Sequence, residues 1–168
     1  LTTNAYVSGS HKDFSYALSG KLYNTDGYRD NSQIKSDDLG LNLGYLFGER
    51  GKVSLSGGYH KDDAGLPGAL RLSDFQAGVP RTGTVNPDDF ANTRDNYVQL
   101  NPELFFFQNS LFKTPLSYRK RDTTQFATFV GGQCEGNTEI KSVTAYPQFV
   151  IKEPISRFDN NLTLGFDY

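Results

Sequence analysis

Arginine and aromatic residues, most of them in the segments that connect the expected strands, are the best candidates for ligand binding. An arginine presents a planar fork of N–H donors to carboxylate or catecholate oxygens, and an aromatic ring adds an apolar contact surface. We predict a surface that binds an anionic ligand, formed by Tyr28, Arg29, Arg71, Phe75, Arg81, Phe90, Phe126 and Phe129. The sequence allows one alternative equally, in which these side chains pack the connecting segments against one another.

Histidines and acidic pairs offer little for a metal site. The two histidines, His11 and His60, are expected at opposite ends of strands, so a site with two histidine ligands is not expected. The aspartate pairs at 37–38, 62–63 and 88–89 do not have the spacing of a calcium-binding loop. We interpret all three pairs as solvated loop charge.

Groups for catalysis are equally sparse. No serine stands at a recognisable spacing from histidine and aspartate, and no glycine-rich loop opens a helix to bind phosphate. His60 with Asp62 and Asp63 is the single cluster that an enzyme could use as acid and base. We therefore expect neither catalysis nor a bound cofactor.

Charge and cysteine content exclude two further classes. The chain has 17 Lys and Arg against 19 Asp and Glu, and the resulting net charge of −2 comes without any basic stripe, so nucleic-acid binding is not expected. Cys134, the only cysteine, lies in the polar stretch GGQCEGN with no histidine nearby. We interpret it as a loop thiol.

Period-two alternation dominates the chain and predicts strands. Between Leu39 and Phe47, for example, every odd-numbered residue is Leu, Tyr or Phe, whereas the even-numbered residues include Gly40, Asn42 and Gly44. The same pattern predicts eight antiparallel strands, at 3–10, 13–23, 39–47, 53–60, 97–106, 112–119, 142–152 and 162–168. We expect little or no helix outside the longest connection, and we expect each strand to have one apolar and one polar face.

Hydropathy and connection lengths favour a barrel of outer-membrane type. No stretch approaches the roughly 18 to 20 apolar residues of a membrane-spanning helix, whereas a β-strand spans with roughly 9 to 11 residues and only half of them need be apolar. The expected connections alternate between short ones, at 10–13, 48–52, 107–110 and 153–160, and long ones, at 24–36, 61–94 and 122–138. Tight turns at one end and long loops at the other are typical of outer-membrane barrels.

Three segments resemble the barrel of TonB-dependent outer-membrane receptors: DGYRDNS at 26–32, GLPGAL at 65–70 and LSYRKRDT at 116–123. The resemblance implies a 22-stranded barrel, an N-terminal plug domain, and uptake of a ferric siderophore, cobalamin or a similar scarce chelate with energy from TonB. It places the chain in the outer membrane of a Gram-negative bacterium, with lipid, lipopolysaccharide, the chelate and, through a plug domain not present here, TonB as partners. Residues 1–168 would then be a single segment from the N-terminal part of the barrel, without plug domain or signal peptide.

A complete eight-stranded barrel with a structural, adhesive or porin role is the alternative, and an outer-membrane enzyme a more remote one. The predicted inner face argues for a larger barrel, because Gly40, Gly44, Ser54, Ser56 and Gly58 are too small to fill a narrow interior. We therefore expect the first and last strands not to pair with each other. In a receptor, the predicted anion-binding residues would meet a chelate or the phosphates of lipopolysaccharide. The inward side chains of Glu103, Lys113, Arg119 and Lys152 would form a network toward the plug or water.

Overall fold

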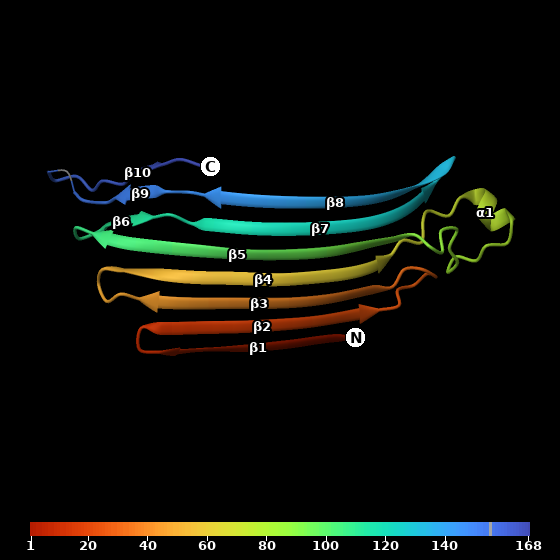
Figure 1. Ribbon diagram of the computed structural model, residues 1–168, viewed down its shortest axis with the longest axis horizontal. Coiled ribbons are helices and arrows are strands. Elements are labelled where there is room, and N and C mark those ends of the chain that lie inside the picture. The colour runs from red at the N-terminus through yellow and green to blue at the C-terminus, as the bar shows by residue number, and fades with distance from the viewer. Residues whose placement is uncertain (155) are drawn as a thin grey trace.

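The computed structural model describes residues 1–154 and 156–168, which form one antiparallel β-sheet with a single short helix (Figure 1). The elements are β1 (Thr2–His11), β2 (Phe14–Thr25), β3 (Ile34–Leu46), β4 (Gly51–Gly65), α1 (Leu72–Gln76), β5 (Phe90–Phe106), β6 (Ser110–Lys113), β7 (Leu116–Phe129), β8 (Gly132–Ala145), β9 (Gln148–Ile151) and β10 (Leu162–Gly165). No helix in the described residues is long and apolar enough to cross a membrane.

Consecutive strands pair as hairpins, and two of the ten strand segments are continuations of their predecessors. Leu100 of β5 pairs with Leu116 of β7, and Glu103 of β5 pairs with Lys113 of β6, so the register does not shift between β6 and β7. The same holds for β8 and β9, which pair with β7 and β6. The ten segments therefore make eight strands, as predicted.

Proline explains both interruptions. Pro115 separates β6 from β7 and Pro147 separates β8 from β9. Because proline has no N–H to donate, the ladder loses one bond at each position while the chain keeps its direction. Both prolines lie near the end of the sheet that carries the short turns.

The pairing register sorts the side chains into an apolar and a polar face. One cross-strand row holds Leu18, Leu41, Gly57, Val98, Tyr118 and Val143, and the adjacent row on the same face holds Tyr16, Leu43, Leu55, Leu100, Leu116 and Ala145. We call these two rows the apolar belt. The rows that alternate with them lie on the opposite face, the polar face. One carries Ala17, Asn42, Ser56, Gln99, Ser117 and Thr144, and the other carries Ser19, Gly40, Gly58, Tyr97, Arg119 and Ser142. The predicted division of the strands into two faces is confirmed.

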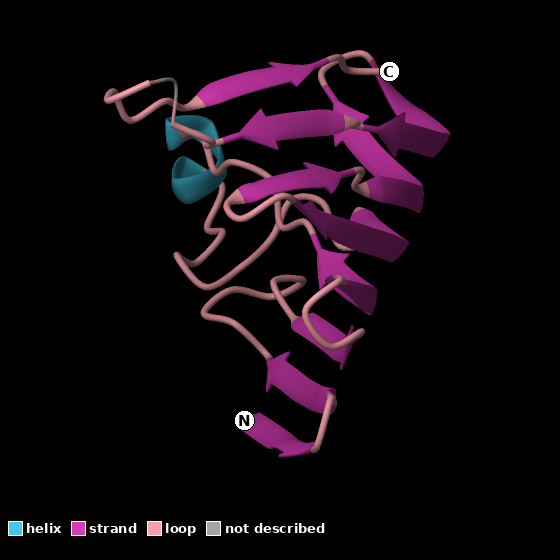
Figure 2. Ribbon diagram, turned by 90° about the vertical axis from the view of Figure 1, so that its left-hand side faces the viewer, coloured by secondary structure: helices cyan, strands magenta, loops and turns pink. Residues whose placement is uncertain are grey.

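This sheet has no internal hydrophobic core. No apolar side chain in the described residues is fully buried, and Val143 in the apolar belt is 68% exposed. Figure 2 shows a single curved layer, with β1 and β10 at separate places in it. Among the described residues β1 pairs with β2 alone and β10 with β9 alone, so the sheet does not close on itself, as predicted.

Connections at the two ends differ in length, but less regularly than predicted. Short turns at 12–13, 47–50 and 107–109 lie at one end, which we call the turn end. The opposite end, the loop end, carries 26–33 and the long connection 66–89, which contains α1 (Figure 1). The predicted short connection at 153–160 includes residue 155, which lies outside the described residues.

The expectation of a long loop at 122–138 is wrong. Strands β7 and β8 continue through it and meet at a two-residue turn, Val130–Gly131. Cys134 consequently lies within β8, with its side chain exposed, and not in a loop. Period-two hydrophobicity disappears in these strands because both faces are polar there, so the pattern that reveals a half-apolar strand is absent.

Candidate functional site

The eight predicted ligand-binding residues all lie in the loop-end half of the molecule, but they do not form one cluster. Tyr28 is 74% exposed in the first loop, and Phe75 and Arg81 are exposed in the long connection. Arg71 and Phe129 line a hollow between loops, and Arg29 is bonded to the backbone of the long connection. Phe90 and Phe126 lie inside strands. Their role in ligand binding stays a prediction.

Arg29 is engaged with the backbone of the long connection. Its Nε donates to Gly83 O at 3.1 Å, Nη1 to Gly68 O at 2.5 Å and Nη2 to Pro67 O at 3.2 Å. Arg29 thereby joins the 26–33 loop to two separate parts of 66–89. A charged donor to three carbonyls is a strong tether, and it leaves fewer N–H groups for a ligand.

Asn31 extends the same tether. Its Nδ2 lies 2.7 Å from Asn86 O, 2.8 Å from Asp89 O and 3.3 Å from Leu66 O, and thus meets both ends of the long connection. The backbone of Asn31 has φ of 56°, in the left-handed region that asparagine tolerates better than most residues. Asparagine at position 31 therefore suits both the left-handed backbone conformation of the loop and the hydrogen bonds to the long connection.

Asp89 completes the connection to the β7–β8 hairpin. Its carboxylate accepts hydrogen bonds from Thr128 N at 2.8 Å, Thr128 Oγ1 at 2.7 Å and Asn86 Nδ2 at 2.7 Å, and the residue is only 3% exposed. Our interpretation of Asp89 as solvated loop charge is therefore wrong. Burial raises the pKa of Asp89, but the hydrogen bonds from Thr128 and Asn86 outweigh burial and hold the pKa below its usual value.

Together, Arg29, Asn31 and Asp89 form what we call the loop clamp. It fixes three segments, 26–33, 66–89 and the tip of the β7–β8 hairpin, relative to each other. Against this clamp lies an open hollow of about 570 Å³, and the predicted residues Arg71 and Phe129 share its wall with Ser73, Asp74, Asn86 and Thr128. Arginine, hydroxyl and aromatic groups around one hollow can bind an anionic ligand that has an apolar part.

Phe90 and Phe126 are paired across two strands. They are register partners in β5 and β7, and their rings stack with centroids 6.3 Å apart and planes inclined by 20°. Phe90 is eight residues from Val98 in the same strand, and side chains an even number of residues apart lie on the same face. Both rings therefore lie on the side of the sheet that carries the apolar belt. The pair therefore lies on the opposite side from the polar face.

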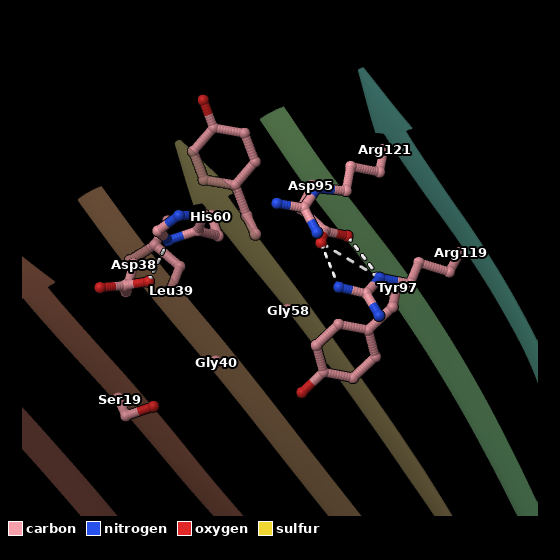
Figure 3. Close-up of a pocket in the computed structure, with 11 residues that line it drawn as sticks. Ser19, Asp38, Leu39, Gly40, Gly58, His60, Asp95, Tyr97, Arg119 and Arg121 are labelled. Carbon is pink, nitrogen blue, oxygen red and sulfur yellow. Dashed lines mark hydrogen bonds and ion pairs between the residues drawn. The ribbon is translucent and has the colours of Figure 1, made fainter. Parts of the chain in front are cut away.

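A second candidate region lies on the polar face, near the middle of the long strands (Figure 3). His60 Nδ1 is 2.6 Å from Asp38 Oδ1, and His60 Nε2 is 3.2 Å from Asp62 Oδ1. The predicted neighbour Asp63 pairs instead with Lys61 on the other face, at 2.7 Å. Because both ring nitrogens of His60 meet carboxylates, the ring has no free nitrogen to activate a nucleophile.

Beside His60 stands an ion pair between neighbouring strands. Arg119 Nε lies 2.9 Å from Asp95 Oδ1, and Arg119 Nη2 also contacts Asp95 Oδ2 (Figure 3). Asp95 is 8% exposed, and Arg121 lines the same hollow of about 440 Å³. The hollow therefore offers alternating acidic and basic groups, which suits contact with a polar protein surface or ordered water.

A glycine shapes this hollow. A Cβ on Gly58 would collide with the ring of Tyr97, its register partner in β5. The ring of Tyr97 can therefore lie flat across β4 only because residue 58 has no side chain.

The inward network expected around Glu103 is present in part. Lys52 Nζ lies 3.3 Å from Glu103 Oε1, and Lys113 is the register partner of Glu103. Sequence reasoning did not find the pairing of Asp95 with Arg119 or the loop clamp. Both join residues separated by at least 24 positions, and only the register or the loop path brings them together. Among the described residues no three His, Cys, Asp or Glu side chains are grouped to hold a metal ion.

Comparison with known proteins identifies the fold. The chain superimposes on the crystal structure of the ferric citrate transporter FecA in the unliganded form with a TM-score of 0.89. The alignment covers 99% of this chain and 25% of that chain, at 19% identity. No family model and no curated protein matches the sequence. The sheet therefore has the fold of a section of an outer-membrane transporter barrel, and it spans about a quarter of the length of that transporter.

Proposed function

We propose that this chain is one section of the barrel wall of an outer-membrane transporter that takes up a scarce metal chelate. The observation that carries the proposal is the match to a ferric citrate transporter over 99% of the chain, with an open sheet whose faces differ in polarity. The apolar belt would contact lipid, and the polar face would line the lumen. The protein would then reside in the outer membrane of a Gram-negative bacterium.

The lumen hollow around His60, Asp95 and Arg119 supports a large barrel. A narrow barrel fills its interior with its own side chains, whereas these charged groups, with Gly40 and Gly58 between them, leave space for water or a plug domain. Uptake would be driven by TonB acting through that plug. The proposed substrates are anionic chelates such as a ferric siderophore or a similar complex, because the loop-end hollow combines Arg71 with Phe129.

Uptake assays in cells test this proposal. Cells that produce the whole transporter to which this section would belong should accumulate a radiolabelled ferric chelate, and loss of TonB should abolish the uptake. Passive entry of small solutes that does not depend on TonB would overturn the proposal and favour a porin.

Binding assays test the hollow separately. Replacing Arg71 and Phe129 together by alanine should weaken chelate binding about tenfold or more, since charged hydrogen bonds contribute about 1.5–3 kcal/mol each. Arg50→Ala is the matched control, because Arg50 is exposed in the turn between β3 and β4 at the opposite end of the sheet. Equal binding by the double variant and the control would remove the hollow from the proposal.

A further inference from the structure

One buried carboxylate holds two polar side chains that stand in the wall of the loop-end hollow. Asn86 and Thr128 both line this hollow, and both are bonded to Asp89, which is 3% exposed. Asn86 belongs to the long connection and Thr128 to β7, near the tip of the β7–β8 hairpin, and the two segments meet at the loop end (Figure 1). Asp89 therefore controls how both side chains are presented to a ligand.

The polar hydrogens of these two side chains are directed at acceptors within the protein. Thr128 Oγ1 lies 2.7 Å from Asp89 Oδ1, and Asn86 Nδ2 lies 2.7 Å from Asp89 Oδ2 and 3.2 Å from Thr128 O. Burial raises the pKa of Asp89, but the hydrogen bonds from Thr128 and Asn86 outweigh burial, so the carboxylate is ionised at neutral pH. An ionised carboxylate has no hydrogen to give, so the hydroxyl of Thr128 must be the donor.

The atoms that these two side chains leave for a ligand are therefore acceptor oxygens. Thr128 Oγ1 keeps its lone pairs, and among residues 1–154 and 156–168 no group donates a hydrogen bond to Asn86 Oδ1. Asp74 adds a carboxylate to the same wall, whereas Arg71 and Ser73 supply its side-chain donors. Beside the arginine, the hollow is thus complementary to a ligand that itself donates hydrogen bonds.

We propose that Asp89 is a positioning residue through which the loop-end hollow selects anionic ligands that also carry O–H or N–H groups. The anionic group meets Arg71 and the apolar part meets Phe129. The O–H or N–H groups donate to the oxygens of Asn86 and Thr128. A site built to bond a hydroxyl rejects an analogue that lacks it, because the oxygens of the site are then left unpaired. The inference rests on the proposed function and narrows its substrate class.

Replacing the carboxylate by an amide should turn the hydroxyl of Thr128 around. Asp89 Oδ2 accepts from two N–H groups, Thr128 N at 2.8 Å and Asn86 Nδ2 at 2.7 Å. In Asp89→Asn the amide oxygen must occupy that place, which leaves the amide nitrogen facing Thr128 Oγ1. The hydroxyl then accepts from the new amide and directs its own hydrogen toward the hollow. Asp89→Asn should therefore change which ligands are preferred, and not only how tightly they bind.

Calorimetric titration of the whole transporter in detergent micelles with two matched probes tests the inference. Gallate combines a carboxylate and an aromatic ring with hydroxyl donors, whereas trimethoxybenzoate keeps the oxygens and lacks the hydrogens. Gallate should bind about fivefold more tightly or better, as expected when one hydrogen bond is lost in the methylated probe. Benzoate, which has neither group, is the control for the larger size of the methoxy groups and should bind about as weakly as trimethoxybenzoate.

In Asp89→Asn the preference for gallate should disappear or reverse. Asp88→Asn is the matched control, because Asp88 is exposed, adjacent in the chain and loses the same charge. Thr128→Val, which removes the hydroxyl and keeps the side-chain shape, should also reduce the preference, and it decides the matter if Asp89→Asn does not fold. Equal binding of both probes by the parent protein would refute the inference. So would a parallel weakening of both probes in Asp89→Asn with the preference retained, since that is the result of a purely structural role.

Uptake assays separate this inference from the proposed function. TonB-dependent uptake of a ferric chelate by a protein that binds both probes equally would refute the inference alone. A preference for gallate without TonB-dependent uptake would refute the transport proposal and leave the selectivity of the hollow standing.

Discussion

The two halves of the long strands differ in the side chains that cover their faces. Toward the turn end, Leu43, Leu55 and Leu100 cover one face while small polar residues cover the other. Toward the loop end most side chains on both faces are polar, and ion pairs such as Lys61 with Asp63 take the place of most apolar contacts. In the proposed outer-membrane placement, the turn-end half would depend on lipid for its stability, whereas the loop-end half would depend on contacts made in water.

The largest effect that this comparison predicts is that of a charge in the apolar belt. Leu43→Arg should destabilise the folded protein in lipid vesicles by about 2–4 kcal/mol, the cost of arginine facing lipid near the bilayer midplane. Asn42→Arg, one residue along on the polar face, should cost much less. Denaturant unfolding in vesicles measures both, and equal costs would show that the apolar belt does not face lipid.

Loss of the Arg29 tether should open the loop end without affecting the strands. In Arg29→Ala we expect amide hydrogens of 66–89 to exchange about tenfold faster, since charged hydrogen bonds contribute about 1.5–3 kcal/mol each. Arg81→Ala, an exposed arginine in the same connection, is the control. Faster exchange in the turn-end halves of β3 and β4 would contradict the independence of the two regions.

A smaller effect is expected where the two halves meet on the polar face. Gly58→Ala should cost about 1 kcal/mol, because the new methyl group forces the ring of Tyr97 to move. In the double variant with Tyr97→Ala the cost of the methyl group should disappear. A double-mutant cycle of unfolding free energies tests this, and additive costs would mean that the ring does not pack over residue 58.

The smallest effect concerns pH. The folded-state pKa of Asp89 is lowered, so its contribution is present above the ordinary aspartate pKa of about 3.9 and is lost as pH falls through the lower folded value. Protection of 66–89 against proteolysis should therefore persist to about pH 4 and decrease below it. Asp89→Asn should lose this acid step, and an unchanged step would assign it to another group.

What the sequence could predict follows the same division. The eight strands and their two faces were predictable because period two is visible wherever one face is apolar. The unpaired terminal strands were predictable because the small residues of the polar face, such as Gly40 and Ser56, cannot fill a narrow barrel. The extension of β7 and β8 through 122–138 was not, because a strand that is polar on both faces has the composition of a loop.

Residue types also indicated the loop-end surface without showing what each residue contacts. Arg29 was predicted to meet a ligand, but its N–H groups meet carbonyls 38 to 54 residues away. Backbone acceptors have no sequence signature, since every residue carries one. The burial of Asp89 was equally invisible, because it depends on Thr128 in a hairpin whose strands the sequence pattern did not reveal.

The prolines near the turn end form a line across three neighbouring strands. Pro102, Pro115 and Pro147 lie within one residue of each other along the ladder, and each accepts a bond from the next strand, from Thr114, Tyr146 and Phe166 respectively. None of them can donate one in return. Along this line the ladder therefore lacks one backbone donor in each of three neighbouring strands, so β6, β9 and β10 are joined to the rest of the sheet by fewer inter-strand hydrogen bonds than the long strands share with one another.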